Sequence, residues 1–282
     1  MLARIAPWLF VLLWSTGFIG ARLGLPHAEP LSFLSLRYAL VLALLLPLAL
    51  AMRAPWPRDA RQWLHIGVSG LLLHGIYLGG VFVAIRHGLP AGITALVVGM
   101  QPLLTAFGAG LLLGEAVTRR QWLGLALGLA GVAMVVSGKV GGGWPLPALW
   151  AALVALVGIT AGTLYQKRYC PRFDLRSGAV LQFLPTALAT ALVAAAAEDF
   201  RIEWTGEFMF ALAWLVLALS LGAIALLNYL IRAGSAVNVA SLFYLTPPTT
   251  ALLAWLIFGE MLSATMIAGM ALAVGGVYLS RR

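Results

Sequence analysis

Long apolar runs leave this chain few ways to fold. Ten runs of about 20 residues, each long enough to cross the hydrocarbon core of a membrane as a helix, are separated by short stretches rich in charge, Pro or Gly. Only 10% of the residues are charged, against about 25% in soluble domains. An ordinary soluble domain is excluded, and the sequence predicts an all-α integral membrane protein. The predicted spans are Ile5–Leu25, Leu31–Met52, Trp63–Arg86, Ala91–Leu113, Arg119–Gly138, Leu146–Arg168, Ser177–Ala197, Phe208–Ile231, Ala236–Phe258 and Ser263–Leu279.

The basic residues are distributed unequally between the two sides of these spans. Thirteen Lys and Arg residues fall on the side of the N-terminus and four on the other, while Arg37 falls within the second span. Cytoplasmic loops retain positive charge, so we expect the inner (plasma) membrane with both termini cytoplasmic. The formal charge of +9 then needs no nucleic acid to explain it. The single cysteine, Cys170, excludes an intramolecular disulfide and a Cys-based structural metal site.

The two halves of the chain repeat. Residues 1–138 and residues 146–282 each hold five predicted spans, and residues 139–145, rich in Gly and Pro, form the predicted linker. Because five is odd, the second unit must enter the membrane from the opposite side, which gives an inverted repeat of the kind used for alternating access. Chance similarity of apolar sequence is the alternative, and the shared order of the matched residues argues against it. The matched positions, 145 or 146 residues apart, are Trp14 with Ile159, Arg22 with Lys167, Arg37 with Gln182, Arg86 with Arg232, Pro102 with Pro248, Glu115 with Glu260, Gly124 with Gly269, and Gly131 with Gly276.

These residues resemble a known family. The run Leu13–Gly17, the segment Leu36–Ala39, and the spacing from Pro102 to Glu115, which is repeated in the second half, look like the two EamA repeats of the drug/metabolite transporter superfamily. The resemblance covers essentially the whole chain. It implies a basket-shaped, monomeric carrier whose central cavity is lined by the first, third, fourth, sixth, eighth and ninth spans. The chain is most similar to bacterial exporters of aromatic amino acids and related metabolites; other family substrates include other amino acids, nucleosides and drugs.

Three prolines are candidate hinges. Pro102 in the fourth predicted span, and Pro247 and Pro248 in the ninth, fall near the middle of apolar runs. A proline inside a helix cannot donate to the carbonyl four residues earlier, so a backbone acceptor is left for a cavity or a neighbouring helix. A hinge or cavity wall and a static packing kink both fit these positions, and their equivalence in the two repeats favours the hinge or wall.

Polar and aromatic side chains at membrane depth are candidate substrate contacts. His74 lies at the centre of the third span, and Tyr77, three residues on, shares its helical face. His74 could donate to a substrate carboxylate, bind a proton, or stay neutral and bonded to a neighbouring helix. Tyr77 could stack on a substrate ring or pack against the next helix. The other candidates, for which packing or interhelical hydrogen bonding is the alternative, are Trp14, Phe18, Gln101, Thr160, Thr163, Asn228, Tyr244 and Thr246.

Charged residues near the span ends are assigned structural roles. Arg37 could attract a carboxylate, but a long arginine near a helix end can also snorkel to the interface, and we favour that interpretation. Glu115 and Glu260 end the fourth and ninth spans and are assigned to loop geometry. Glycines in the fifth and tenth spans predict close helix packing. They could also support a dimer through those two helices, although a monomer is expected.

Other function classes lack their signatures. The chain contains no G-x-x-x-x-G-K-[ST] motif for nucleotide drive, and no acidic residue falls within a predicted span, which disfavours an aspartyl protease and a carboxylate proton relay. We expect no metal, no cofactor, and no partners beyond membrane lipid and a small-molecule substrate. The sequence thus predicts a secondary transporter that exports small metabolites, downhill or by exchange, with amino acids bearing aromatic or bulky apolar side chains as the expected cargo. Other metabolites or drugs, and an integral membrane enzyme centred on His74, are the alternatives.

Overall fold

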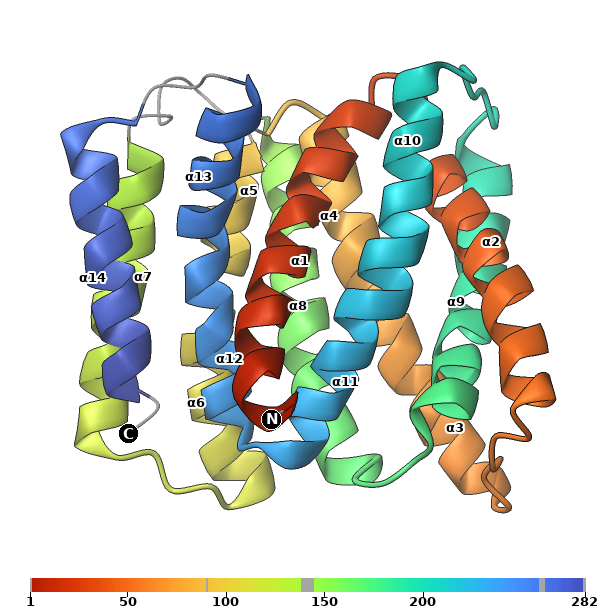
Figure 1. The fold of residues 1–282 in the computed structure, drawn as a ribbon, viewed down its shortest axis with the longest axis horizontal. Coiled ribbons are helices and arrows are strands. Elements are labelled where there is room, and N and C mark those ends of the chain that lie inside the picture. Colours follow the sequence, from red (N-terminus) through yellow and green to blue (C-terminus); the bar gives the residue numbers. More distant parts are fainter. Residues whose placement is uncertain (1, 90, 138–144, 259–261, 281–282) are drawn as a thin grey trace.

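The computed structural model describes residues 2–89, 91–137, 145–258 and 262–280, and this part of the chain is an all-helical bundle without a strand. Figure 1 shows the helices standing side by side, with α1 beginning and α14 ending at the same end of the bundle. That end is termed the terminal face, and the opposite end the distal face. The predicted linker, which includes Lys139, lies outside the described residues apart from Pro145. Glu260, Arg281 and Arg282 also lie outside them.

The helices follow the predicted apolar runs closely at most of their ends. Their bounds in chain order, with η1 and η2 as π-helical turns and η3 as a 3₁₀ turn, are α1 (Leu2–Gly24), α2 (Pro30–Ala51), α3 (Ala60–Gly70), η1 (Leu71–Ile76), α4 (Tyr77–Arg86), α5 (Ala91–Val98), α6 (Gln101–Leu113), α7 (Arg119–Ser137), α8 (Leu146–Tyr169), α9 (Leu175–Ala197), α10 (Gly206–Trp214), η2 (Leu215–Ala223), α11 (Ile224–Ala233), α12 (Ala236–Ser241), η3 (Leu242–Leu245), α13 (Thr246–Phe258) and α14 (Ala264–Ser280).

Seven helical segments of the described chain are long and apolar enough to cross a membrane. They are Ile5–Gly24, Pro30–Ala51, Ala60–Arg86, Leu146–Tyr169, Leu175–Ala197, Gly206–Ala233 and Ala236–Ile257. The predicted span 91–113 is divided at Gly99 and Met100, and α14 has 17 residues. The chain is therefore a helical membrane protein, while the count of ten spans and the inverted repeat stay predictions.

Polar side chains fix where helices begin. Thr118 and Gln121 exchange the two hydrogen bonds of a capping box at the start of α7. The Asp174 carboxylate accepts a hydrogen bond from the backbone N–H of Arg176, at 2.9 Å, and begins α9. Hydrogen bonds from the Arg176 guanidinium also hold the pKa of the Asp174 carboxyl below its usual value. These contacts satisfy N–H groups that have no partner within a helix.

Glycines bring α7 and α14 together with their backbones in contact. A Cβ on Gly131 would lie 2.4 Å from the backbone N of Ala273, and a Cβ on Gly276 would lie 2.4 Å from the backbone N of Gly128. Only residues without a side chain fit at such separations, as in close membrane-helix pairs. The predicted close packing of these two helices is confirmed, and their glycine faces are occupied within the chain.

Helical geometry is interrupted at equivalent points of the two halves. Adding 145 to the bounds of η1 gives residues 216–221, which lie within η2. Pro102 lies in the first turn of α6, after the break at Gly99, and Pro247 and Pro248 lie in the first turn of α13, after η3. The prediction that Pro102 sits inside a continuous helix is wrong, whereas Pro247 and Pro248 stay within the helical segment Ala236–Ile257, after its 3₁₀ turn. Proline is tolerated in a first turn because the N–H groups there have no helical partner.

Two charged side chains clamp the turn between α11 and α12 at the terminal face. Lys167 Nζ donates to the carbonyl oxygens of Ile231, at 3.0 Å, and Gly234. The Glu115 carboxylate accepts from the backbone N–H of Ala236, with N–O distances of 3.2 and 3.3 Å. Cations favour the C-terminal end of a helix and anions the N-terminal end, so each charge matches its site. The loop role predicted for Glu115 agrees with this contact.

Candidate functional site

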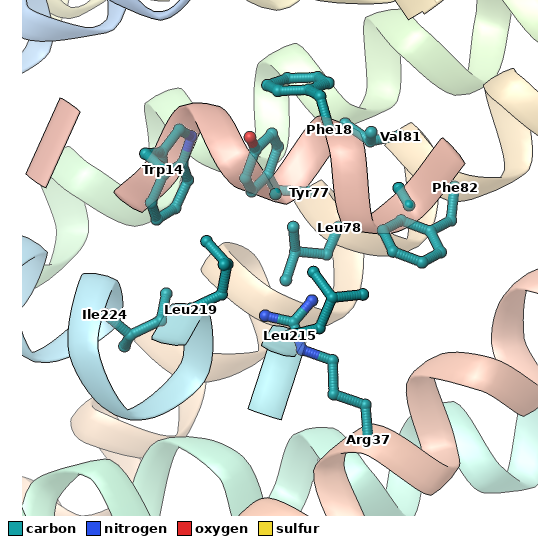
Figure 2. A pocket seen from close by; sticks show the side chains of 12 residues that line it. Trp14, Phe18, Arg37, Tyr77, Leu78, Val81, Phe82, Leu215, Leu219 and Ile224 are labelled. Carbon is teal, nitrogen blue, oxygen red and sulfur yellow. The ribbon is translucent and has the colours of Figure 1, made fainter. Parts of the chain in front are cut away.

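A cavity, termed the main cavity, lies between α1, α2, α4 and η2. Its unfilled space, including the part that opens outward, is about 460 Å³. Ala21 and Phe82 lie about one turn from the distal ends of α1 and α4, so the cavity occupies the distal half of the bundle. Its lining, most of it labelled in Figure 2, consists of Trp14, Gly17, Phe18, Ala21, Arg37, Tyr77, Leu78, Val81, Phe82, Leu215, Leu219 and Ile224.

An aromatic wall, formed by Trp14, Phe18 and Tyr77, separates the main cavity from a second, small cavity. The rings of Trp14 and Tyr77 are stacked, with centroids 6.2 Å apart and planes inclined by 6°. The small cavity has about 250 Å³ of unfilled space. Beyond the wall itself, it is lined by Ala95, Val98, Gly99, Phe243, Thr246 and Pro247. Both faces of the wall therefore line a cavity.

Arg37 is the charged group of the main cavity. The residue is 3% exposed, and its Nε donates to Ser220 Oγ of η2 at 2.9 Å. Figure 2 shows the guanidinium reaching from α2 to lie beside Leu215, below Leu78 in this view. The predicted snorkelling of Arg37 is therefore wrong. The helix places this side chain toward the interior of the bundle, so the guanidinium ends in the cavity and not at the interface.

The structure brings part of the predicted site together. Trp14, Phe18 and Tyr77 line both cavities, and Thr246 and Pro247 line the small one. The spacing of Trp14 and Phe18 along α1 explains why these two side chains lie together, because residues three or four apart share one face of a helix. Their role in substrate binding stays a prediction.

His74 lies outside both linings. The residue is 0% exposed, and its ring stacks on Phe183 of α9, with centroids 4.5 Å apart and planes inclined by 5°. Neither ring nitrogen has a hydrogen-bond partner among the described residues. The backbone carbonyl of His74 accepts from the Tyr38 hydroxyl at 2.8 Å. The structure thus separates His74 from Tyr77, with which the sequence grouped it.

Asn228 belongs to a closed ring of three amides, termed the amide ring, which joins α8, α9 and α11. Gln182 Nε2 donates to Gln166 Oε1 at 2.9 Å, Gln166 Nε2 to Asn228 Oδ1 at 3.0 Å, and Asn228 Nδ2 to Gln182 Oε1 at 2.9 Å. Gln182 also donates to Ser69 Oγ at 3.0 Å. These amides are buried, and interhelical hydrogen bonding accounts for Asn228.

The remaining polar candidates lie away from the two linings. Gln101 Nε2 reaches Thr163 Oγ1 only at 3.5 Å, and Gln101 Oε1 has no partner in the described chain. Thr160 Oγ1 donates to the carbonyl of Leu156 at 2.7 Å. The Tyr244 hydroxyl is buried without a partner among the described residues, and its ring lies against Gly128. Pro102 and Pro248 also stand outside both linings.

Sequence reasoning missed the η2 side of the main cavity and also Phe82 of α4. Leu215, Leu219 and Phe82 look like ordinary apolar core residues, and no periodicity distinguishes a cavity-facing leucine from a buried one. The sequence did contain a signal for Arg37. It is an ionisable residue inside a predicted span, and no predicted span contains an acidic residue that could act as its counter-charge.

An all-helical membrane chain with an aromatic cavity between its helices has the form of a small-molecule transporter. The chain belongs to the EamA-like transporter family, whose model matches residues 5–137 and again residues 146–282.

Curated relatives and a solved structure agree with this assignment. The chain is 29% identical over 255 residues to the uncharacterized inner membrane transporter YedA of Escherichia coli (strain K12), covering 89% of this chain and 81% of the relative. It is 26% identical over 285 residues to a probable amino-acid metabolite efflux pump of Salmonella typhimurium, covering 96% and 92%. A crystal structure with 24% identity aligns with a TM-score of 0.80 over 98% of this chain and 95% of the other, and it supports the fold alone.

Proposed function

We propose that this chain is a secondary carrier that exports small amphipathic metabolites, among them amino acids with aromatic or bulky apolar side chains, by alternating access. The observation that carries the proposal is the aromatic wall, which lines a cavity on each of its two sides. A stacked Trp14–Tyr77 pair gives a substrate ring a flat apolar surface at membrane depth. A wall of this kind can serve a site that opens first to one side and then to the other.

The proposed architecture is ten spans arranged as two inverted five-helix repeats, residues 1–138 and 146–282, joined by a linker at 139–145. Three observations support it. The family model matches the chain twice, once in each half. The π-helical turns η1 and η2 fall at the same register, and prolines begin α6 and α13 at matched positions. Discontinuous helices at equivalent points are typical of inverted-repeat transporters.

The proposed orientation places the terminal face in the cytoplasm and the protein in the inner membrane. The excess of Lys and Arg on the N-terminal side of the predicted spans supports this direction, as does the inner-membrane description of YedA. In this orientation the main cavity lies in the outer half of the membrane, and the amide ring lies in the inner half.

The proposed cargo rests on the cavity chemistry and on the name of one relative, the probable amino-acid metabolite efflux pump. Other small metabolites or drugs of similar shape would use the same wall. An enzyme centred on His74 draws no support from the geometry, because that ring packs on Phe183 outside both cavities. We propose a monomer as the working unit, since the glycine faces of α7 and α14 contact each other.

The test is uptake of labelled phenylalanine by proteoliposomes that contain the purified chain. We expect Trp14→Ala to lower the initial rate by at least about tenfold, since a buried stacking surface is lost. Trp8, also on α1 but 59% exposed, provides the matched control, and Trp8→Ala should leave the rate within about twofold. Absence of uptake by the unmodified chain, or equal rates for the two variants, would contradict the proposal.

The coupling mode is tested with the same vesicles. No acidic residue lies within a predicted span, so we expect an imposed pH gradient to change the rate of phenylalanine uptake by less than about twofold. Strong stimulation that disappears in His74→Ala would indicate proton coupling through that ring and would overturn the downhill mode.

A further inference from the structure

We propose that Arg37 is an anion-binding site and that the preferred cargo of the main cavity is an amphipathic monocarboxylate without an amino group. The inference rests on the proposed function, because it assigns a substrate class to the same cavity. It starts from a charge that the protein itself leaves unmatched.

The Arg37 guanidinium has one hydrogen bond in the structure, from Nε to Ser220 Oγ at 2.9 Å. Its two terminal nitrogens have no acceptor among the described residues, although the residue is almost fully buried and lines the main cavity. Arginine stays protonated and carries five N–H donors, so most of its bonding capacity is unused here. A buried charge left in this state is costly unless a counter-charge arrives with a ligand.

The protein offers no internal counter-charge in its described part. Of the nine acidic residues, eight are described, and each of these lies in a loop, at a cap or in a first helical turn, with another partner. These partners are the Asp199 N–H for Glu29, the Arg61 N–H for Asp59, the Ala236 N–H for Glu115, Arg176 for Asp174, Ser32 for Glu198, Arg201 for Asp199, and His27 for Glu203 and Glu207. The counter-charge for Arg37 must therefore come from outside the described chain.

The rest of the lining indicates what kind of group is joined to the negatively charged end of the ligand. Across the cavity from Arg37 lie Trp14, Phe18 and Tyr77, while Leu215 and Leu219 close the η2 side (Figure 2). The planar guanidinium fork binds a carboxylate through two parallel hydrogen bonds. A carboxylate joined to an aromatic or bulky apolar group therefore satisfies both ends of the cavity.

The lack of an acidic group also disfavours an amine on the same molecule. A monoanion neutralises Arg37, whereas a zwitterionic amino acid brings an ammonium group that finds no carboxylate in the lining and leaves a net positive charge. An aromatic face could also receive the ammonium by a cation–π contact, and the face of Phe18 is open to it. Trp14 and Tyr77 each have one face covered by the ring of the other, because the two rings are stacked. The charge balance therefore favours the deaminated acid over the amino acid.

The experiment measures equilibrium binding of three probes with one ring and one chain length to the purified full chain in detergent at neutral pH. They are 3-phenylpropanoate, L-phenylalanine and phenethylamine, which carry the carboxylate, both charged groups, and the ammonium, respectively. We expect 3-phenylpropanoate to bind at least about tenfold more tightly than phenylalanine, since the ammonium is buried without a partner. Phenethylamine should bind most weakly. Tighter binding of phenylalanine or phenethylamine than of 3-phenylpropanoate would overturn the proposal without any mutant.

Variants then locate the anion site. Arg37→Gln should weaken 3-phenylpropanoate binding by at least about tenfold, and Arg37→Lys, which keeps the charge but not the fork, should bind with intermediate affinity. Arg201→Gln removes a positive charge from a side chain that is 84% exposed and should leave binding unchanged. Unchanged binding in Arg37→Gln would overturn the assignment, and Arg37→Lys supplies the same comparison if the Gln variant fails to fold.

The two proposals fail in different ways. Trp14-dependent uptake of phenylalanine together with Arg37-independent binding of 3-phenylpropanoate would overturn the anion site and leave the carrier function standing. Arg37-dependent binding of 3-phenylpropanoate without any phenylalanine uptake would overturn amino-acid export and leave the anion site standing. Absence of both uptake and binding would overturn both.

Discussion

The two halves of the chain treat one helical position in opposite ways. Arg37 is the eighth residue of α2 and Gln182 is the eighth residue of α9, 145 residues later. Each lies about 10 Å from the start of its helix, which for α2 is the distal end and for α9 the terminal end. Arg37 faces the main cavity, whereas Gln182 is held in the amide ring. One position is left open and its counterpart is closed.

The chemistry of the two side chains explains the difference. An amide carries both a donor and an acceptor, so three amides can satisfy one another in a ring. A guanidinium carries donors alone and stays incomplete until an acceptor reaches it. The comparison teaches that the terminal half of the bundle is closed by bonds the protein makes to itself, while the distal half keeps a bonding site free.

The largest effect on stability is expected when the same residue stands at both positions, 37 and 182. Gln182→Arg puts an unpaired charge into the amide ring, where no cavity receives it, and should lower the free energy of unfolding by about 3–5 kcal/mol. Thermal unfolding in detergent, followed by fluorescence, measures the loss. The reciprocal change, Arg37→Gln, should cost less than about 1 kcal/mol because it removes a desolvated charge. Equal stability of Gln182→Arg and the unmodified chain would refute the contrast.

A milder change opens the amide ring without adding charge. Asn228→Leu leaves Gln166 and Gln182 each with an unmatched group and should cost about 1–2 kcal/mol. Gln101→Leu is the control, because its single hydrogen bond is long, at 3.5 Å, and should cost less. Binding of 3-phenylpropanoate should persist in the folded fraction of Asn228→Leu. Loss of binding with unchanged stability would return Asn228 to the substrate site where the sequence placed it.

Two serines accept hydrogen bonds from the contrasted side chains, Ser220 from Arg37 and Ser69 from Gln182. Ser220→Ala removes the one acceptor that Arg37 has in the described chain and should cost about 1 kcal/mol. Ser69→Ala should cost less, since Gln182 Nε2 keeps its bond to Gln166. The difference in melting temperature between the two variants is the measurement, and a larger effect in Ser69→Ala would contradict the bonding pattern.

The smallest effect on stability is expected from the residues that precede α9 and α2. Hydrogen bonds from Arg176 lower the pKa of the Asp174 carboxyl, so its carboxylate stabilises the folded chain above the unfolded-state pKa of about 4. This contribution is lost as the pH falls through the lower folded-state pKa. Asp174→Asn should therefore cost about 0.5 kcal/mol at pH 7 and progressively less below pH 4. Melting curves across this range measure the difference.

Glu29 supplies the matched comparison for that pH dependence. It precedes α2 as Asp174 precedes α9, but its side chain makes no capping bond to its own helix and accepts instead from the Asp199 N–H, at 2.9 Å. If Asp174→Asn costs as much at pH 3 as at pH 7, the stabilisation does not come from the carboxylate.

How much of this could be predicted depended on what each signal reports. Apolar run length fixed most helix ends, and helical spacing correctly grouped Trp14 with Phe18, because both signals are local. The placement of Pro102 failed because an apolar run does not show whether it holds one helix or two. Interhelical hydrogen bonding was one of the two interpretations of Asn228, but its partners could not be predicted, because they lie 46 and 62 residues away along the chain.

Arg37 shows a different limit of prediction. Its distance from the helix end was read correctly, but the interpretation weighed only its own helix. The absence of acidic residues from every span was the global fact that bore on it. A charge in a membrane helix is better judged against the inventory of the whole chain than against its depth alone.

An arginine that takes its counter-ion from the cargo makes the loaded site electrically neutral and the empty site positive. Under the anion proposal, voltage therefore acts on the return of the empty site, which an inside-negative potential draws toward the cytoplasm. Each cycle moves one negative charge out of the cell. A potential of 100 mV then supplies about 2.3 kcal/mol per cycle. This free energy can hold the cargo concentration outside the cell about 50-fold above the concentration inside. A carrier without a carboxylate in its predicted spans would need no proton relay to work uphill.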